Sequence, residues 1–200
     1  MTRLRLSGSI VLAVVLVAVA IFYSFYQPFI PNAVYDAVPV QATFKHKVKS
    51  LDELLESPVC AQLDKALGAG NSLKVLLDSN DWVKLTASSE IAVATLPLRH
   101  ADQPKSWVAI SWVGWRSPWL RWKLEQTRTE GFSFLGKHSV WPVWKYETAD
   151  IARGMSLTLS LTDNLFITCL SENPADIFYL LDTYDKRILS VNAMEQRKLK

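Results

Sequence analysis

The sequence predicts an α+β protein, with an N-terminal transmembrane helix followed by an antiparallel sheet packed with helices. Three observations predict this architecture. The N-terminal region is a long run without charge, residues 155–162 alternate strictly between apolar and polar side chains, and capped apolar stripes typical of short helices lie before and after the strand-like segments. Strands joined by short turns, with helices grouped around them, are typical of antiparallel sheets.

The first predicted element is a helix that crosses the membrane. No charged residue occurs between Arg5 and Asp36, and Leu6–Tyr26 supplies 21 mainly apolar residues, whereas about 20 helical residues cross a bilayer core. Arg3 precedes the run together with Arg5, so the positive-inside bias keeps that end in the cytoplasm. We therefore expect residues 1–29 to form a cytoplasmic stub and membrane anchor in the cell inner membrane, with the domain that follows on the periplasmic or extracellular side.

The apolar run is also compatible with a cleaved signal peptide or a buried core helix. Ala18-Val19-Ala20 matches the A-x-A cleavage site of a secretory signal peptide, and a core helix would be equally apolar. The residues after Ala20 stay apolar and aromatic, which favours an uncleaved anchor over a cleaved signal peptide.

The chain beyond the anchor divides into a linker, a domain and a tail. Residues 30–49 contain Pro31, Pro39 and a basic run, which predicts a juxtamembrane linker, although the alternation over 38–48 would also suit an edge strand. Residues 50–185 are expected to form the extracytoplasmic α+β domain. Residues 186–200 are basic and are expected to be a solvated terminus.

Capping residues mark the predicted helices. Ser50 and Glu53 form a capping box, and Ser57-Pro58 places a cap and a first-turn proline at the start of a second helix. A third helix is expected around residues 73–77. Asn173-Pro174 opens the last one, whose apolar stripe comprises Ile177, Leu180, Leu181 and Tyr184.

Short strand-like segments follow one another between these helices. A helix over 118–127 interrupts them after its own Ser117-Pro118 cap. The predicted strands are Ile91–Leu98, Ser106–Val113, Phe132–Leu135, Val140–Glu147, Met155–Thr162 and Leu165–Leu170.

The last two strands predict a specific hairpin. Asp163-Asn164 suits a two-residue turn. Its register pairs Leu161 with Phe166, Leu159 with Thr168 and Leu157 with Leu170. We therefore expect one strongly apolar inner face and a mixed outer face that carries Thr158, Ser160, Ile167 and Cys169.

The charge distribution argues against nucleic acid as a partner. The net charge is +3, but Arg3 and Arg5 carry +2 and residues 186–200 carry +4, which leaves −3 on the rest of the chain. Nucleic-acid binding requires a basic stripe, and a mildly acidic domain does not supply one.

The two cysteines, Cys60 and Cys169, leave two interpretations open. An oxidising compartment permits a disulfide between them, which would close a loop worth about 4–5 kcal/mol in the chain-entropy model. Alternatively, both are buried free thiols, because cysteine behaves as a small hydrophobe. Neither has a partner at zinc-site spacing, and no metal is expected.

Tryptophan is the unusual residue of this chain. Seven of the eight lie within the segment 107–144. Because side chains alternate along a strand, one Trp of each pair in the strands around 107–112 and 141–144 is expected in the core. The remainder predicts a contact surface, for which the candidates are Trp115, Trp119, Trp122 and Trp141.

Catalytic signals are weak. His100 and Asp102 lie two residues apart in a predicted loop, a pattern that can serve acid–base chemistry but is common in solvated loops. The sequence contains no nucleophile elbow, P-loop or dinucleotide fingerprint. We expect no catalytic residues and no cofactor.

The segment from Trp107 to Leu181 resembles uncharacterised membrane-anchored bacterial envelope proteins. The resemblance lies in Trp107-Val108-Ala109-Ile110, the hairpin at Asp163-Asn164, and Ser171–Pro174 leading into a closing helix. It implies an envelope location and a fold style, and no catalytic residues.

These observations predict a membrane-anchored, non-catalytic interaction or accessory subunit on the extracytoplasmic side of the membrane. Its partners would be the lipid bilayer and other membrane or envelope proteins, with membership of a larger membrane complex as one variant. The alternative is an envelope hydrolase or glycan-binding protein that uses His100, Asp102 or the Trp-rich segment.

Overall fold

The computed structural model describes residues 14–19, 33–68, 72–78, 84, 89–97, 106–126, 131–146 and 154–186. Residues 14–19 are helical with exposed side chains. The rest of the predicted anchor, with Ala20 of the cleavage motif, lies outside the described residues, as does the tail after residue 186. Among the described residues, no helix combines the length and the apolar character needed to cross a membrane.

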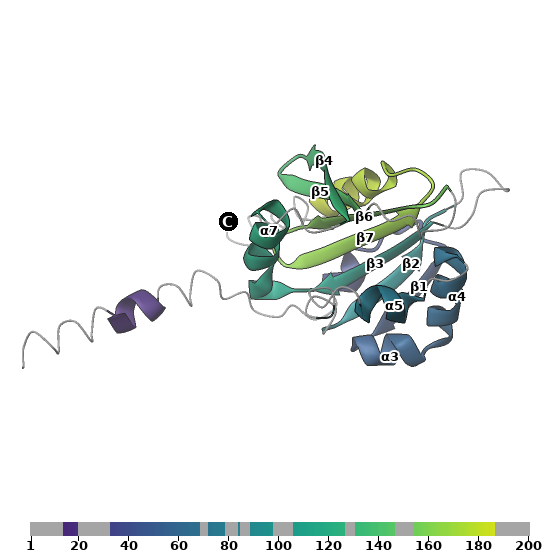
Figure 1. Ribbon diagram of the computed structural model, residues 1–200, viewed down its shortest axis with the longest axis horizontal. Helices are drawn as coiled ribbons and strands as arrows, with labels where there is room; N and C mark the ends of the chain where they lie inside the picture. Colours follow the sequence, from purple (N-terminus) through teal and green to yellow (C-terminus); the bar gives the residue numbers. More distant parts are fainter. Residues whose placement is uncertain are drawn as a thin grey trace, which may run out of the picture.

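The centre of the domain is a seven-stranded sheet whose neighbouring strands are all antiparallel (Figure 1). The strand order is β1-β2-β3-β7-β6-β5-β4, so the meander β4 to β7 ends in the middle of the sheet, against β3. The fold is therefore α+β with an antiparallel sheet, as the sequence predicts. The strands are β1 (Phe44–Val48), β2 (Ile91–Thr95), β3 (Trp107–Trp112), β4 (Phe132–His138), β5 (Trp141–Tyr146), β6 (Ser156–Leu161) and β7 (Leu165–Ser171).

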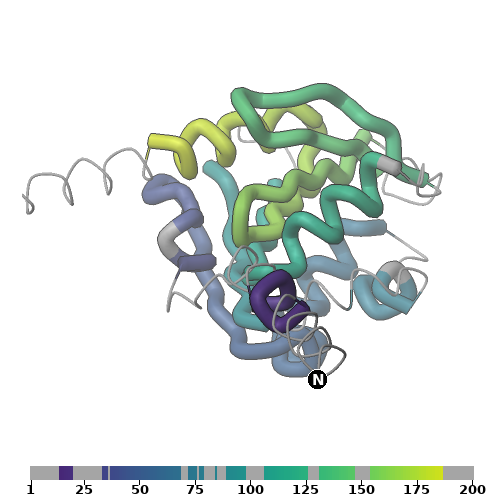
Figure 2. Tube along the Cα trace, turned by 90° about the vertical axis from the view of Figure 1, so that its left-hand side faces the viewer, coloured from purple at the N-terminus to yellow at the C-terminus, as the bar shows by residue number. Residues whose placement is uncertain are grey.

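Helices cover both faces of this sheet (Figures 1 and 2). One face, which we call the closed face, is covered by α2 (Ala33–Asp36) and a C-terminal helix over residues 176–186. The other, the divided face, carries two separate groups of helices. The first group is α3 (Leu51–Glu56), α4 (Pro58–Leu67) and α5 (Leu73–Asp78), and the second is the 3-10 turn η1 (Gly114–Arg116) with α7 (Ser117–Gln126).

The closed face is densely packed. The side chains of Ile110, Ile167 and Ile177 are at most 1% exposed and belong to one apolar cluster. Thr158 and Ser160 also lie on this face and are completely buried. Their hydroxyls donate to backbone carbonyls, those of Cys169 at 3.2 Å and Pro142 at 2.8 Å. The predicted residues do share one face, but the prediction that this face is an outer one is wrong. Helices bury it, and local hydrogen bonds satisfy its polar groups.

The divided face contains two apolar clusters instead of one. Val93 and Trp107 pack with Leu63 of α4 beside α3 and α5, whereas Leu120 of α7 packs with Trp144 and its neighbours at the opposite end. Within the described residues, the two groups of helices pack on separate apolar clusters.

The predicted hairpin is confirmed residue by residue. Leu161 pairs with Phe166, Leu159 with Thr168 and Leu157 with Leu170. The alternation determines this register, because a slip by one residue would exchange the two faces.

The predicted helices form, but two of the predicted caps differ: Ser117 lies inside α7 and its hydroxyl donates to the carbonyl of Thr162, and Ser57 makes no cap bond. Glu53 donates its backbone N–H to Ser50 Oγ at 3.2 Å, and its carboxylate accepts from the N–H of Lys49 at 2.7 Å. Ser57 precedes Pro58 as expected, but its hydroxyl donates to the carbonyl of Leu54 at 2.7 Å and makes no cap bond to α4. This serine therefore closes α3 instead of capping the next helix.

The prediction of a linker over residues 30–49 is wrong for its described part, which begins at residue 33. Val34 and Val38 are at most 1% exposed in the core of the closed face, and β1 forms an edge of the sheet. Tyr179 of the C-terminal helix also donates to Gln41 Oε1 at 3.0 Å. The alternative of an edge strand over 38–48 is confirmed for Phe44–Val48, and burial of Val34 and Val38 places the segment before it in the core.

Candidate interaction site

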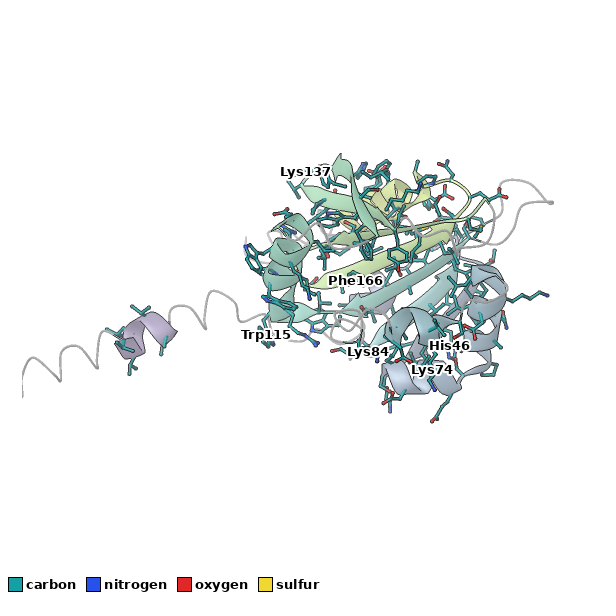
Figure 3. The ribbon with its side chains drawn as sticks, viewed as in Figure 1. His46, Lys74, Lys84, Trp115, Lys137 and Phe166 are labelled. Atoms are coloured by element: carbon teal, nitrogen blue, oxygen red, sulfur yellow. The ribbon has the colours of Figure 1, made fainter. Side chains whose placement is uncertain are left out.

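Three tryptophans stand on the outer side of η1 and α7. Trp115, Trp119 and Trp122 are 64%, 44% and 55% exposed, and we call them the tryptophan surface. Their spacing of four and then three residues is that of one helical stripe. Figure 3 shows Trp115 toward the left-hand side of the domain, and Phe166 in the middle of the sheet.

The inner side of α7 holds this surface in place. Leu120 and Leu124 are 1% and 6% exposed and pack on Trp144 and Leu159. The buried hydroxyl of Ser117 donates to the carbonyl of Thr162 at 2.5 Å. The helix is therefore fixed by burial and a buried hydrogen bond on one side, and it presents indole rings to solvent on the other.

Basic side chains lie around the tryptophan surface. Lys123 Nζ is 5.4 Å from the ring centroid of Trp119, within cation–π range. Arg116 donates to Ser89 Oγ at 3.1 Å, and burial lowers the pKa of its guanidinium. Arg121 instead turns inward and donates to the carbonyl of Leu161 at 3.1 Å.

The prediction that Trp141 belongs to this surface is wrong. Trp141 is 6% exposed, and its indole N–H donates to Asp185 Oδ1 of the C-terminal helix at 2.7 Å. Its ring packs edge-on against Tyr184, with the ring centroids 6.0 Å apart. Strand parity correctly separates Trp141 from Trp144, but both are buried because both faces of the sheet are covered.

The two cysteines are free and buried. Cys60 lies on α4 over the divided face, whereas Cys169 points into the closed face, so the sheet lies between them and no disulfide joins them. Burial raises the pKa of the Cys169 thiol to about 12. Burial and the nearby carboxylate of Asp64 also raise the pKa of Cys60. Both changes keep the thiols protonated and unreactive near neutral pH.

The two described histidines, His46 of β1 and His138 of β4, lie on the two opposite edge strands of the sheet. His100 and Asp102, the candidates for the hydrolase alternative, lie outside the described residues. His138 Nε2 lies 2.7 Å from Asp182 Oδ1, and its ring stacks on Phe178, which ties β4 to the C-terminal helix. The described part of the chain holds no group of three or more His, Cys, Asp or Glu able to bind a metal ion.

Sequence reasoning missed an apolar cavity on the divided face. It has a volume of about 140 Å³ and is lined by residues of α3, α4 and α5 and of strands β2, β3, β4, β6 and β7. Such a site is not visible in any single segment. The one local signal is Ala109, a small residue in the middle of a strand of large side chains.

Comparison with known proteins identifies no relative. No family model, curated protein or solved structure matches this chain.

Proposed function

We propose that this chain is a membrane-anchored, non-catalytic interaction or accessory subunit, which acts on the extracytoplasmic side of the membrane as part of a larger membrane complex. The observation that carries the proposal is the tryptophan surface. A membrane or envelope protein is the proposed partner.

The exposure of these rings is unusual within the molecule itself. The four strand tryptophans Trp107, Trp112, Trp141 and Trp144 are all at most 6% exposed. At about 250 Å² for a complete side chain, the tryptophan surface presents roughly 400 Å² to solvent. Patches of this size on monomers are often functional, and tryptophan and arginine are enriched among the residues that dominate binding energy.

The predicted anchor would keep this surface close to membrane proteins. If Leu6–Tyr26 spans the bilayer, six residues separate it from Ala33, where the described domain begins. Six extended residues span at most roughly 20 Å. The domain would thus be confined next to the membrane surface, which raises its effective concentration toward membrane partners.

The test is a comparison of partners recovered with matched variants. The full-length tagged chain is solubilised from membranes in mild detergent, and co-eluting proteins are quantified by mass spectrometry. The test variant replaces Trp115, Trp119 and Trp122 by Ser. The control replaces three exposed valines by Ser at positions distant in sequence from α7, namely Val40, Val75 and Val140, which are 71%, 57% and 64% exposed.

We expect the triple Trp variant to lose one or more partners that the wild type and the Val control retain. The interaction should then be reproduced with the purified partner. Equal recovery by both variants would contradict the proposed surface. Recovery of a glycan polymer instead of a protein would favour the glycan-binding alternative.

The anchor is tested separately. We expect the native chain to stay in the membrane fraction after a carbonate wash and to retain its residues before Ala20. A mature chain that begins at Ile21, or that moves to the aqueous fraction, would remove the anchored part of the proposal.

A further inference from the structure

The described helices leave the middle of the divided face incompletely covered. Ala109 of β3 pairs with Thr168 of β7 at the centre of the sheet, and both are only partly buried. The side chains on either side of them along the same strands, such as Ser111 and Leu170, are 4% and 5% exposed. The gap therefore lies over the central pair, between the two groups of helices.

This gap is the apolar cavity of about 140 Å³. Trp107 and Phe166 contribute aromatic walls, and Phe166 lies between α5 and α7 in the middle of the sheet (Figure 3). Among the described residues, no charged side chain lines the cavity. A site of this kind accepts hydrocarbon and excludes charged groups, because desolvating a charge without a partner is costly.

One polar group in the lining has unused hydrogen-bonding capacity. Ser111 lines the cavity and is 4% exposed, and its Oγ has no hydrogen-bond partner among the described residues. The other hydroxyl in the lining, Thr168 Oγ1, donates to the carbonyl of Ala109 at 3.0 Å. A buried hydroxyl without a partner is uncommon in folded proteins, and it indicates where an oxygen of a ligand would bind.

We propose that the cavity binds a fatty acyl chain, with the Ser111 hydroxyl hydrogen-bonded to an oxygen of its uncharged ester or protonated carboxyl group. A flexible hydrocarbon chain suits an irregular apolar cavity, and the single hydroxyl supplies the orientation that binding sites obtain from a few polar groups. This inference does not rest on the tryptophan surface. It goes beyond the proposed interaction role by assigning a ligand-binding site to the divided face of the sheet, away from the exposed side of α7.

The test maps cross-links in the full chain. The protein is reconstituted in phospholipid nanodiscs with hexadecanoic acid that carries a diazirine, or with phosphatidylcholine that carries the same chain. After irradiation, labelled peptides are identified by mass spectrometry. We expect labelling in the peptides that contain residues 107–112 and 157–170, and the two probes distinguish a free fatty acid from a phospholipid as the source of the chain.

Two variants test the cavity itself. Ala109→Leu places a larger apolar side chain on the cavity floor and should reduce this labelling at least about tenfold while the domain stays folded, because filling an empty apolar site is tolerated or stabilising. Ala61→Leu makes the same change at an exposed position of α4 and should leave labelling unchanged. Ser111→Ala removes the hydroxyl and should weaken labelling roughly two- to tenfold.

The apolar N-terminal run is an internal control. Labelling of that run without labelling of the domain would overturn the acyl-chain proposal and leave the membrane anchor supported. Equal labelling of wild type and the Ala109→Leu variant would also overturn it. Labelling of the cavity peptides without labelling of residues 6–26 would support the acyl-chain site and contradict the anchor.

Discussion

The two faces of the sheet use the same strands but differ in how they are covered. On the closed face, α2 and the C-terminal helix pack on one continuous cluster in which Ile110 and Ile167 are at most 1% exposed. On the divided face, two helix groups pack on separate clusters, and the central pair Ala109 and Thr168 is only partly buried. Both faces therefore bury apolar side chains, but the cavity and the exposed aromatic stripe lie on the divided face.

The largest loss of stability is expected when a substitution creates a cavity in the closed face. Ile110→Ala should lower the free energy of unfolding by about 2–5 kcal/mol, because the side chain is 0% exposed and its neighbours are held by packing on all sides. The free energy of unfolding is measured by urea denaturation of the full-length chain in mild detergent, with tryptophan fluorescence as the signal. Ile110→Val is the matched control and should lose about 0.5–1.5 kcal/mol. A loss below that of the control would mean that this face is not tightly packed.

A smaller effect is expected where the C-terminal helix is tied to β5. Trp141→Phe keeps most of the ring but removes the N–H that donates to Asp185. Hydrogen bonds to charged groups contribute about 1.5–3 kcal/mol, and partial exposure of Asp185 places the expected loss near the lower limit. The same denaturation measures it, with Trp119→Phe on the tryptophan surface as the control that should change little.

The buried thiol of Cys169, on the closed face, makes the free energy of unfolding depend on pH. Its pKa is raised to about 12 from 9.0, so above pH 9 the unfolded chain releases this proton before the folded chain does. Stability contributed by the neutral thiol is therefore complete below pH 9 and decreases as pH rises toward 12, by about 1.4 kcal/mol per unit. Denaturation at pH 8 and pH 10 should show a steeper loss for wild type than for Cys169→Ala. Parallel losses would contradict burial of the thiol.

The smallest effect is expected at the gap in the divided face. Ala109→Leu should change the free energy of unfolding by less than about 1 kcal/mol, because the larger side chain enters existing space. Thermal unfolding measured beside Ala61→Leu checks this. A loss of several kcal/mol would show that the cavity over β3 and β7 is too small to hold a leucine side chain.

Much of the fold could be predicted from local patterns. The alternation from Met155 onward and the turn at Asp163-Asn164 determine a register that the structure reproduces. Ser50 caps α3, and Asn173, whose Oδ1 accepts from the N–H of Ala175 at 3.0 Å, lies in the turn just before the C-terminal helix. The stripe formed by Trp115, Trp119 and Trp122 also follows from spacing, once α7 is known to be a helix packed through Leu120.

The sequence alone thus determined the α+β class, the helix starts, the hairpin register and the exposed stripe, because each depends on the preferences of neighbouring residues. Only the tertiary structure decided that β7 lies between β3 and β6, that both faces of the sheet are covered, and that Trp141 is buried. It also decided that a gap remains above Ala109. These features depend on contacts between segments far apart in the chain, and such contacts leave no periodic signal in any one of them.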